Sequence, residues 1–242
     1  MFVEMEHIYF AEQCDEVKER KKLVCYTQTK QPEQKLEGHT TLQIILQQEE
    51  DELLADLSKM NRYMLRRAKK EPYQVIVKED PTDLELKEFQ QFYNAFAKMK
   101  DTNRVRKFHM QTLQLLREKG ALVYTKLQNY EGDALCYRLY IVDGDMVLNL
   151  YTGTAAWIKD RSDLKQQIRF ANRYLLWENI MMFRNRGFAR YDFGALTNKE
   201  EIKEFKLGFG GQEVDVYFGY LTDSMIGKLF LQLRKLKFKV VK

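Results

Sequence analysis

The chain has 242 residues, of which 45% are hydrophobic and 31% are charged, so it can build a sizeable core and an intrinsically disordered protein is excluded. Three cysteines without a Cys-x-x-Cys pair argue against a disulfide framework or a cysteine-rich zinc site. The net charge of +5 permits an anionic partner, such as a phosphate, a nucleic acid or a membrane surface, without requiring one.

The first third of the chain is predicted to form short strands followed by a helix. Extended apolar segments predict strands within residues 1–46, and we expect residues 1–40 to be an N-terminal extension to the main domain. From 49 to 70, apolar residues recur at helical spacing, which predicts one helix that ends before Pro72. Residues 73–78 then alternate as a strand does.

The rest of the chain mixes helices and strands. Gly-containing turns between three successive strands predict an antiparallel meander, and a long helix with one apolar face follows it. This order indicates an α/β domain of the α+β layered kind, in which helices cover a mixed sheet over residues 41–242. The expected helices are 84–100, 105–119, 163–186 and 199–206, and the expected strands are 121–127, 134–142, 146–152, 188–193 and 213–220.

Four segments carry a resemblance to a known family. They are Leu57–Lys70 (LSKMNRYMLRRAKK), Ala171–Trp177 (ANRYLLW), Tyr191–Gly194 (YDFG) and Glu204–Gly211 (EFKLGFGG). In order and spacing they resemble the Fem-type branch of the GNAT superfamily, which includes enzymes that add amino acids to peptidoglycan precursors. The resemblance covers about residues 41–220 and implies a GNAT-like mixed central sheet flanked by helices. Because typical Fem enzymes contain two such units, residues 1–40 would be a remnant of the first.

The resemblance implies an N-acyltransferase that moves an acyl or aminoacyl group to an amine of a cell-envelope precursor or saccharide. One alternative is a Fem-like aminoacyl-tRNA-dependent peptidoglycan transferase, and another is a non-catalytic GNAT scaffold that binds a partner. The donor would be an acyl-CoA, another acyl carrier or an aminoacyl-tRNA. Residues 165–171 lack the glycines with which typical GNAT enzymes bind the pyrophosphate of acetyl-CoA. We therefore expect a bulkier carrier or a tRNA to be preferred.

Acyl transfer to an amine requires a cation or hydrogen-bond donor where the oxyanion develops. The resemblance assigns this role to Lys206, whose alternative is an ordinary solvated lysine, and Asp192 could accept a proton or hold the amine, unless it is a structural cap. Neighbouring residues in the same two segments are candidate substrate contacts. These are Phe205, Tyr191, Gly208 and Gly210.

Two groups of basic residues are candidate anion sites. Arg62 and Arg66 fall on one helical face, where they could bind the phosphate of a substrate or the backbone of a tRNA. Around the start of the long helix, unpaired N–H groups and positive charge could bind donor phosphates. For both groups, the alternative is a solvated basic surface. The candidate donor-binding residues are Arg161, Lys165, Arg169 and Asn172.

The sequence also bears on location and metals. Residues 1–10 lack a signal-peptide pattern and no apolar run reaches the roughly 20 residues of a membrane span, so we expect a cytoplasmic protein. Residues 228–242 contain six basic and no acidic residues among leucines and phenylalanines, which could contact the inner face of an anionic membrane or dock on the domain. Three widely spaced histidines indicate no metal site. The sequence indicates no oligomeric state.

Overall fold

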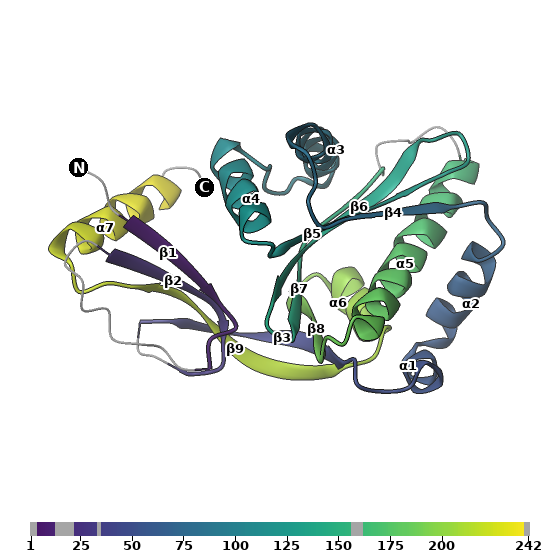
Figure 1. Cartoon of the computed structure of the whole chain (residues 1–242), viewed down its shortest axis with the longest axis horizontal. Helices are drawn as coiled ribbons and strands as arrows, with labels where there is room; N and C mark the ends of the chain where they lie inside the picture. The colour runs from purple at the N-terminus through teal and green to yellow at the C-terminus, as the bar shows by residue number, and fades with distance from the viewer. Residues whose placement is uncertain (1–3, 13–21, 33–34, 156–161, 240–242) are drawn as a thin grey trace. The chain divides into compact units, whose positions relative to one another are not determined.

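The computed structural model describes residues 4–12, 22–32, 35–155 and 162–239 (Figure 1). The chain divides into two compact units. The larger unit is Leu42–Gln212, and the smaller combines Met1–Thr41 with Glu213–Lys242. The chain crosses between the units within two strands, β3 (Glu37–Ile45) and β9 (Gln212–Leu221).

The larger unit is built on a mixed sheet, as the sequence predicts. Its strands follow one another in the order β3-β8-β7-β6-β5-β4. The pairs β4/β5, β5/β6 and β6/β7 are antiparallel, which confirms the predicted meander, whereas β7 and β8 are parallel. The bounds are β4 (Gln74–Lys78), β5 (Leu122–Gln128), β6 (Ala134–Asp143), β7 (Met146–Thr154) and β8 (Arg190–Ala195).

Helices cover both faces of this sheet. Helix α3 (Asp83–Lys100) lies on one face and α5 (Ser162–Asn185) on the other (Figure 1). Side chains along a strand alternate between the faces. On β6, Tyr137 therefore packs against Phe92 of α3 with 4.5 Å between ring centroids, whereas Cys136 belongs to the cluster under α5. Both faces of β6 are consequently buried in the core.

The single helix predicted over 49–70 is two helices, so this prediction is wrong in detail. Helix α1 (Glu50–Asp56) and helix α2 (Lys59–Ala68) are separated by Leu57, whose backbone is extended. Ser58 then caps α2, because its hydroxyl accepts a hydrogen bond from the Asn61 backbone N–H at 3.2 Å. The apolar stripe continues across the break, which is why the periodicity alone does not reveal it.

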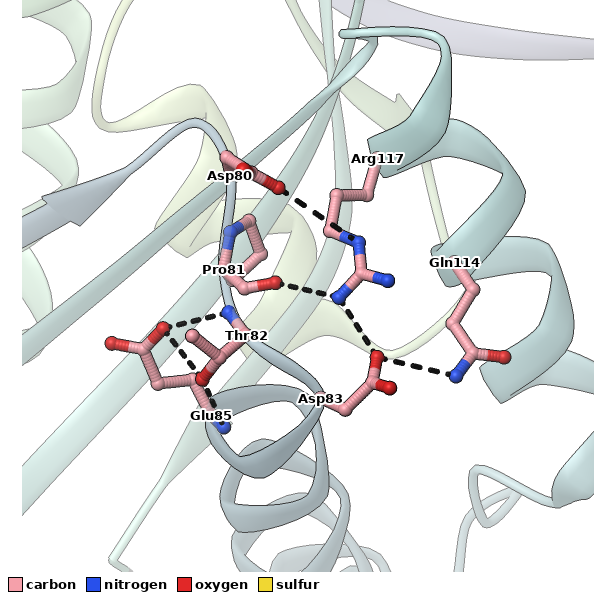
Figure 2. A network of polar contacts seen from close by, with 7 residues as sticks. All are labelled: Asp80, Pro81, Thr82, Asp83, Glu85, Gln114 and Arg117. Atoms are coloured by element: carbon pink, nitrogen blue, oxygen red, sulfur yellow. Dashed lines mark hydrogen bonds and ion pairs between the residues drawn. The ribbon is translucent and has the colours of Figure 1, made fainter.

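The start of α3 is fixed by a polar network that Figure 2 shows. Thr82 and Glu85 form a capping box, in which each side chain accepts a hydrogen bond from the other's backbone N–H. Arg117 of α4 (Lys107–Glu118) donates to the Pro81 carbonyl at 2.9 Å and to the Asp83 carboxylate at 2.8 Å. The hydrogen bond from Arg117 lowers the pKa of Asp83. This network joins α3 and α4 above the sheet.

The smaller unit contains two further strands and the last helix. Strand β1 (Glu4–Tyr9) is parallel to β2 (Lys22–Thr29), and β2 is antiparallel to β9. Helix α7 (Met225–Lys239) follows β9. The small core of this unit is Val24, Tyr26, Leu36 and Leu221. In the described part of the chain, no helix combines the length and apolar character needed to cross a bilayer.

Candidate active site

The candidate site lies where the parallel strands β7 and β8 separate. Their pairing joins Met146–Leu148 to Arg190–Asp192, but β7 continues to Thr154 and β8 to Ala195. Just beyond the last pair, Gly194 has φ +71, a left-handed conformation that favours glycine. The regular pairing of β8 with β7 therefore ends at Asp192, and the last carbonyl groups of β8 accept hydrogen bonds from a side chain.

Lys206 supplies that side chain from α6 (Glu200–Leu207). Its ammonium group donates three hydrogen bonds to consecutive carbonyl oxygens at the end of β8. The distances are 2.9 Å to Phe193, 3.1 Å to Gly194 and 2.8 Å to Ala195. A lysine held by three backbone carbonyls is not the freely solvated surface group considered as the alternative.

The environment of Lys206 shifts its protonation toward neutral pH. The pKa of Lys206 is lowered from 10.5 to about 8, mainly by burial; the carboxylate of Asp192 opposes this shift and the positive charge of Arg138 adds to it. The ammonium form still predominates at pH 7. The site thus holds a cation that is partly desolvated and close to its titration point, as is typical of functional positions.

Asp192 is fully buried in the middle of β8, and both of its carboxylate oxygens accept hydrogen bonds. One accepts from the Gly194 backbone N–H at 2.6 Å, and the other accepts from the side chain of Gln43 at 2.9 Å. These bonds hold Gly194 in its left-handed turn and join β8 to β3. The geometry favours a role in which Asp192 holds Gly194 in position and contributes negative charge near Lys206, rather than one in which it contacts an amine directly.

Arg138 is a charged residue of this site that the sequence analysis missed. It lies on β6 beneath α5, is 1% exposed, and donates to three neutral side chains. The acceptors are Asn149 at 3.3 Å, Thr152 at 3.1 Å and Asn172 at 2.9 Å. Its Nε has no hydrogen-bond partner, and among the described residues it forms no ion pair with a carboxylate. An arginine within the apolar run ALCYRLYIV was the available signal.

The three charged groups leave the site with a net positive charge. Arg138 and Lys206 contribute two cations, and Asp192 contributes one carboxylate. Burying charge without an equal opposing charge costs free energy. A site with this imbalance would bind an anion, or stabilise a negative charge that develops during a reaction, better than a neutral site would.

A chain of contacts from α5 and α2 holds α6 in place. Arg173 of α5 donates to the Asn61 side-chain oxygen at 2.8 Å, and its guanidinium stacks over the ring of Phe205, 5.1 Å from the centroid. Asn61 in turn donates to the Gly208 carbonyl at 2.7 Å. Phe205 and Gly208, expected to contact substrate, thus contact protein and fix the helix that carries Lys206.

The other two predicted substrate contacts, Tyr191 and Gly210, lie in different surroundings. Tyr191 is fully buried, with its ring 4.9 Å from that of Phe193, so it supports the site from within the core. Gly210 and Gly211 line a pocket of about 240 Å³ beside Gln43 and Asp56. A Cβ on Gly211 would lie only 2.6 Å from the Gln43 carbonyl. Close packing against protein therefore explains the glycines at least in part.

Arg62 and Arg66 are found at a second pocket, of about 270 Å³. Arg62 donates to the Ala55 and Leu57 carbonyls at 2.7 Å each and so caps the end of α1. Arg66 and Lys69 line the same pocket, and their charged groups make no hydrogen bond or ion pair with other described residues. The pocket places cations over an apolar floor. Its lining residues are Leu54, Arg62, Leu65, Arg66, Lys69 and Trp177.

The candidate donor-binding residues do not form one cluster. Lys165 and Arg169 are exposed on α5, whereas Asn172 points inward and accepts the hydrogen bond from Arg138. Arg161 lies outside the described residues. Among the described residues, no group of three or more His, Cys, Asp or Glu side chains could hold a metal ion.

No family model and no curated protein matches the sequence. Solved structures do match. FemX superposes with a TM-score of 0.61 at 14% identity, over 80% of this chain and 63% of that chain. The C-terminal domain of an Agrobacterium fabrum protein described as a lysylphosphatidylglycerol synthetase gives 0.54 at 12% identity, over 88% of this chain and 72% of that chain. L-PGS from Bacillus licheniformis gives 0.53 at 12% identity, with the same coverage.

These matches identify the fold. The chain has the GNAT-like, Fem-related acyltransferase fold that the sequence segments predict. It spans less than two thirds of the length of FemX. At 12 to 14% identity the similarity establishes the fold alone, and activity has to be argued from the site.

Proposed function

We propose that this protein is an acyltransferase that transfers an acyl or aminoacyl group to an amine of a cell-envelope precursor or saccharide. The observation that carries the proposal is the ammonium group of Lys206, held in a partly desolvated position where β7 and β8 separate. The fold supports it, since the matching structures include FemX and the C-terminal domain of the protein described as a lysylphosphatidylglycerol synthetase.

In the proposed reaction, the acceptor amine attacks the carbonyl carbon of an ester or thioester donor. The carbonyl electron pair moves to oxygen, and the positive charges of Lys206 and Arg138 stabilise that oxyanion. When the tetrahedral intermediate collapses, an amide bond forms and the bond to the carrier breaks. The proton lost by the amine is matched by the proton that the carrier oxygen or sulfur gains. An oxyanion also offsets the excess positive charge of the resting site.

Lys206 can exchange one of its hydrogen bonds for a substrate oxygen. Its bond to the Ala195 carbonyl is solvent-exposed, whereas those to Phe193 and Gly194 are partly buried. Replacing the exposed bond would leave two carbonyls to orient the ammonium. Asp192 would act through its neighbours, by holding Gly194 and by favouring the charged form of Lys206.

For the donor, we infer a bulky acyl carrier or an aminoacyl-tRNA in preference to acetyl-CoA. Exposed Lys165 and Arg169 on α5 could bind phosphate groups through charge, but no glycine in 165–171 lets the backbone approach a pyrophosphate closely. For the acceptor, the pocket lined by Arg62, Arg66 and Lys69 offers cations for a phosphate above an apolar surface.

The test is a transfer assay with the purified chain. Labelled aminoacyl-tRNAs and long-chain acyl-CoAs serve as donors, and peptidoglycan precursors and amino sugars serve as acceptors, with mass spectrometry of the product. An amide product that requires the enzyme supports the proposal, and a peptidoglycan product from tRNA would favour the narrower Fem-like activity. Absence of product from every pair would favour a non-catalytic binding scaffold. Tight stoichiometric binding of acetyl-CoA in calorimetry would contradict the donor inference.

A further inference from the structure

Helix α7 carries apolar residues on two faces, and one of them is anchored to the smaller unit. Gly227 in its first turn is buried against Thr222, whose side chain occupies the space that a Cβ at residue 227 would need. The Ser224 hydroxyl accepts a hydrogen bond from the Gly227 backbone N–H at 3.2 Å and so caps the helix. The first turn of α7 is therefore fixed just after β9.

The other apolar face of α7 is exposed. Met225, Leu229 and Leu233 are 85%, 56% and 58% exposed, and their spacing of four residues places them in one row along the helix. Single exposed leucines are common on protein surfaces, but a continuous apolar row on a helix that is already anchored by another face marks a contact surface.

The charges around this row define the kind of partner. Residues 224–242 contain no Asp or Glu and six Lys or Arg residues. At about 100° per residue, the exposed Lys228 falls beside the apolar row, and the sequence from 234 to 242 supplies the other five basic residues. An apolar row in a basic segment without carboxylates matches the interface of an anionic bilayer, where apolar groups enter the acyl region and cations meet lipid phosphates.

We propose that α7 is a membrane-docking helix that lies in the surface of an anionic bilayer through Met225, Leu229 and Leu233. A second copy of this chain fits the same surface less well, because pairing the apolar rows would bring together two segments that each contain six basic and no acidic residues. The proposal involves no residue of the candidate active site, so it stands or fails independently of the transferase activity. It would place the enzyme at a surface that carries lipid-linked acceptors.

The test is flotation of the full chain with vesicles of phosphatidylcholine alone or with about one third phosphatidylglycerol. We expect binding to the anionic vesicles only, and a steep loss of binding between about 0.05 M and about 0.5 M salt. The double variant Leu229→Ser/Leu233→Ser should bind on the order of 100-fold more weakly. Gln232→Ser, a substitution at an exposed polar position of the same helix, is the matched control and should bind as the wild type does.

Circular dichroism establishes that each variant retains its folded structure before binding is compared. Equal binding to neutral and anionic vesicles, no vesicle binding by the folded wild type, or unchanged binding by the double leucine variant would each overturn the proposal. So would a lipid-free dimer that dissociates on Leu229→Ser/Leu233→Ser substitution, because the row would then be a contact between two copies of the chain.

Discussion

The low pKa of Lys206 makes the stability of this protein depend on pH in a way that a single substitution should abolish. Below pH 8 both the folded and the unfolded chain carry the ammonium group. Between about pH 8 and 10.5 the unfolded chain keeps the proton and the folded chain has lost it. Since the unfolded state then binds more protons, the free energy of unfolding that Lys206 contributes rises with pH across this window and levels off above it.

The magnitude follows from the width of that window. Each pH unit is worth about 1.4 kcal/mol for one proton, so the interval from about 8 to 10.5 sets a ceiling near 3.5 kcal/mol. Because the lysine is only partly buried and solvent screens its charge, we expect a rise of about 1–3 kcal/mol. Lys206→Met cannot titrate, and Lys206→Arg stays charged throughout. Neither variant should show the rise.

The assay is urea unfolding at a series of pH values from about 7 to about 11. Subtracting the free energy of unfolding of Lys206→Met from that of the wild type cancels the titration of groups that the two proteins share, including tyrosines such as Tyr151, whose pKa burial raises to about 12. The same subtraction with Lys206→Arg is the control. A difference that stays constant within about 0.5 kcal/mol would refute the desolvated, carbonyl-bound lysine.

Three further substitutions probe the surroundings of the site. Asp192→Asn removes the negative charge that favours the ammonium form of Lys206, so the pH-dependent rise in the free energy of unfolding should begin below pH 8. A rise that begins at the same pH as in the wild type would contradict an electrostatic interaction between Asp192 and Lys206. Arg138→Met removes a positive charge that lowers the pKa of Lys206, so the pH-dependent rise in the free energy of unfolding should begin above pH 8. If the rise instead began below pH 8, as expected for Asp192→Asn, Arg138 would not be repelling the ammonium group. Residue Gly211 has φ +102, and a new Cβ there would lie 2.6 Å from a backbone carbonyl. Gly211→Ala should therefore lower the free energy of unfolding, measured in urea, by about 2–4 kcal/mol. Gly120→Ala, at φ +66 in open space, is its control, and equal costs would show that crowding is unimportant.

The sequence predicted the layered fold because the information for it is local and periodic. Alternation and turn glycines identify the meander of β5, β6 and β7, and the segments around Asp192 and Lys206 identify the family of folds. The break between α1 and α2 at Leu57 was missed because the apolar stripe runs through it and only the cap at Ser58 marks it. Such a break depends on contacts elsewhere, here the Gly208 carbonyl, which accepts a hydrogen bond from the Ser58 N–H at 2.9 Å.

The site itself was only partly predictable. The sequence identifies Lys206 as the candidate cation, but its bonds to three carbonyls depend on where the pairing of β8 with β7 ends and on the left-handed turn at Gly194. Arg138 was missed because its partners lie on β7 and α5, distant in sequence. Gly208 is predicted to contact substrate, and in the structure its carbonyl accepts a hydrogen bond from Asn61. A glycine in the sequence is compatible with close approach of either a substrate or another part of the protein to its backbone, and the sequence does not distinguish the two.

The most direct test of the central claim is single-turnover transfer by the wild type and by Lys206→Met, with whichever donor and acceptor the transfer assay identifies. A contact made mainly in the transition state should lower the rate by about 100-fold or more on substitution while donor affinity changes little. Lys206→Met keeps most of the apolar side chain, so folding can be verified in the same sample. A correctly folded variant that transfers at the wild-type rate would show that the reaction occurs elsewhere on the protein.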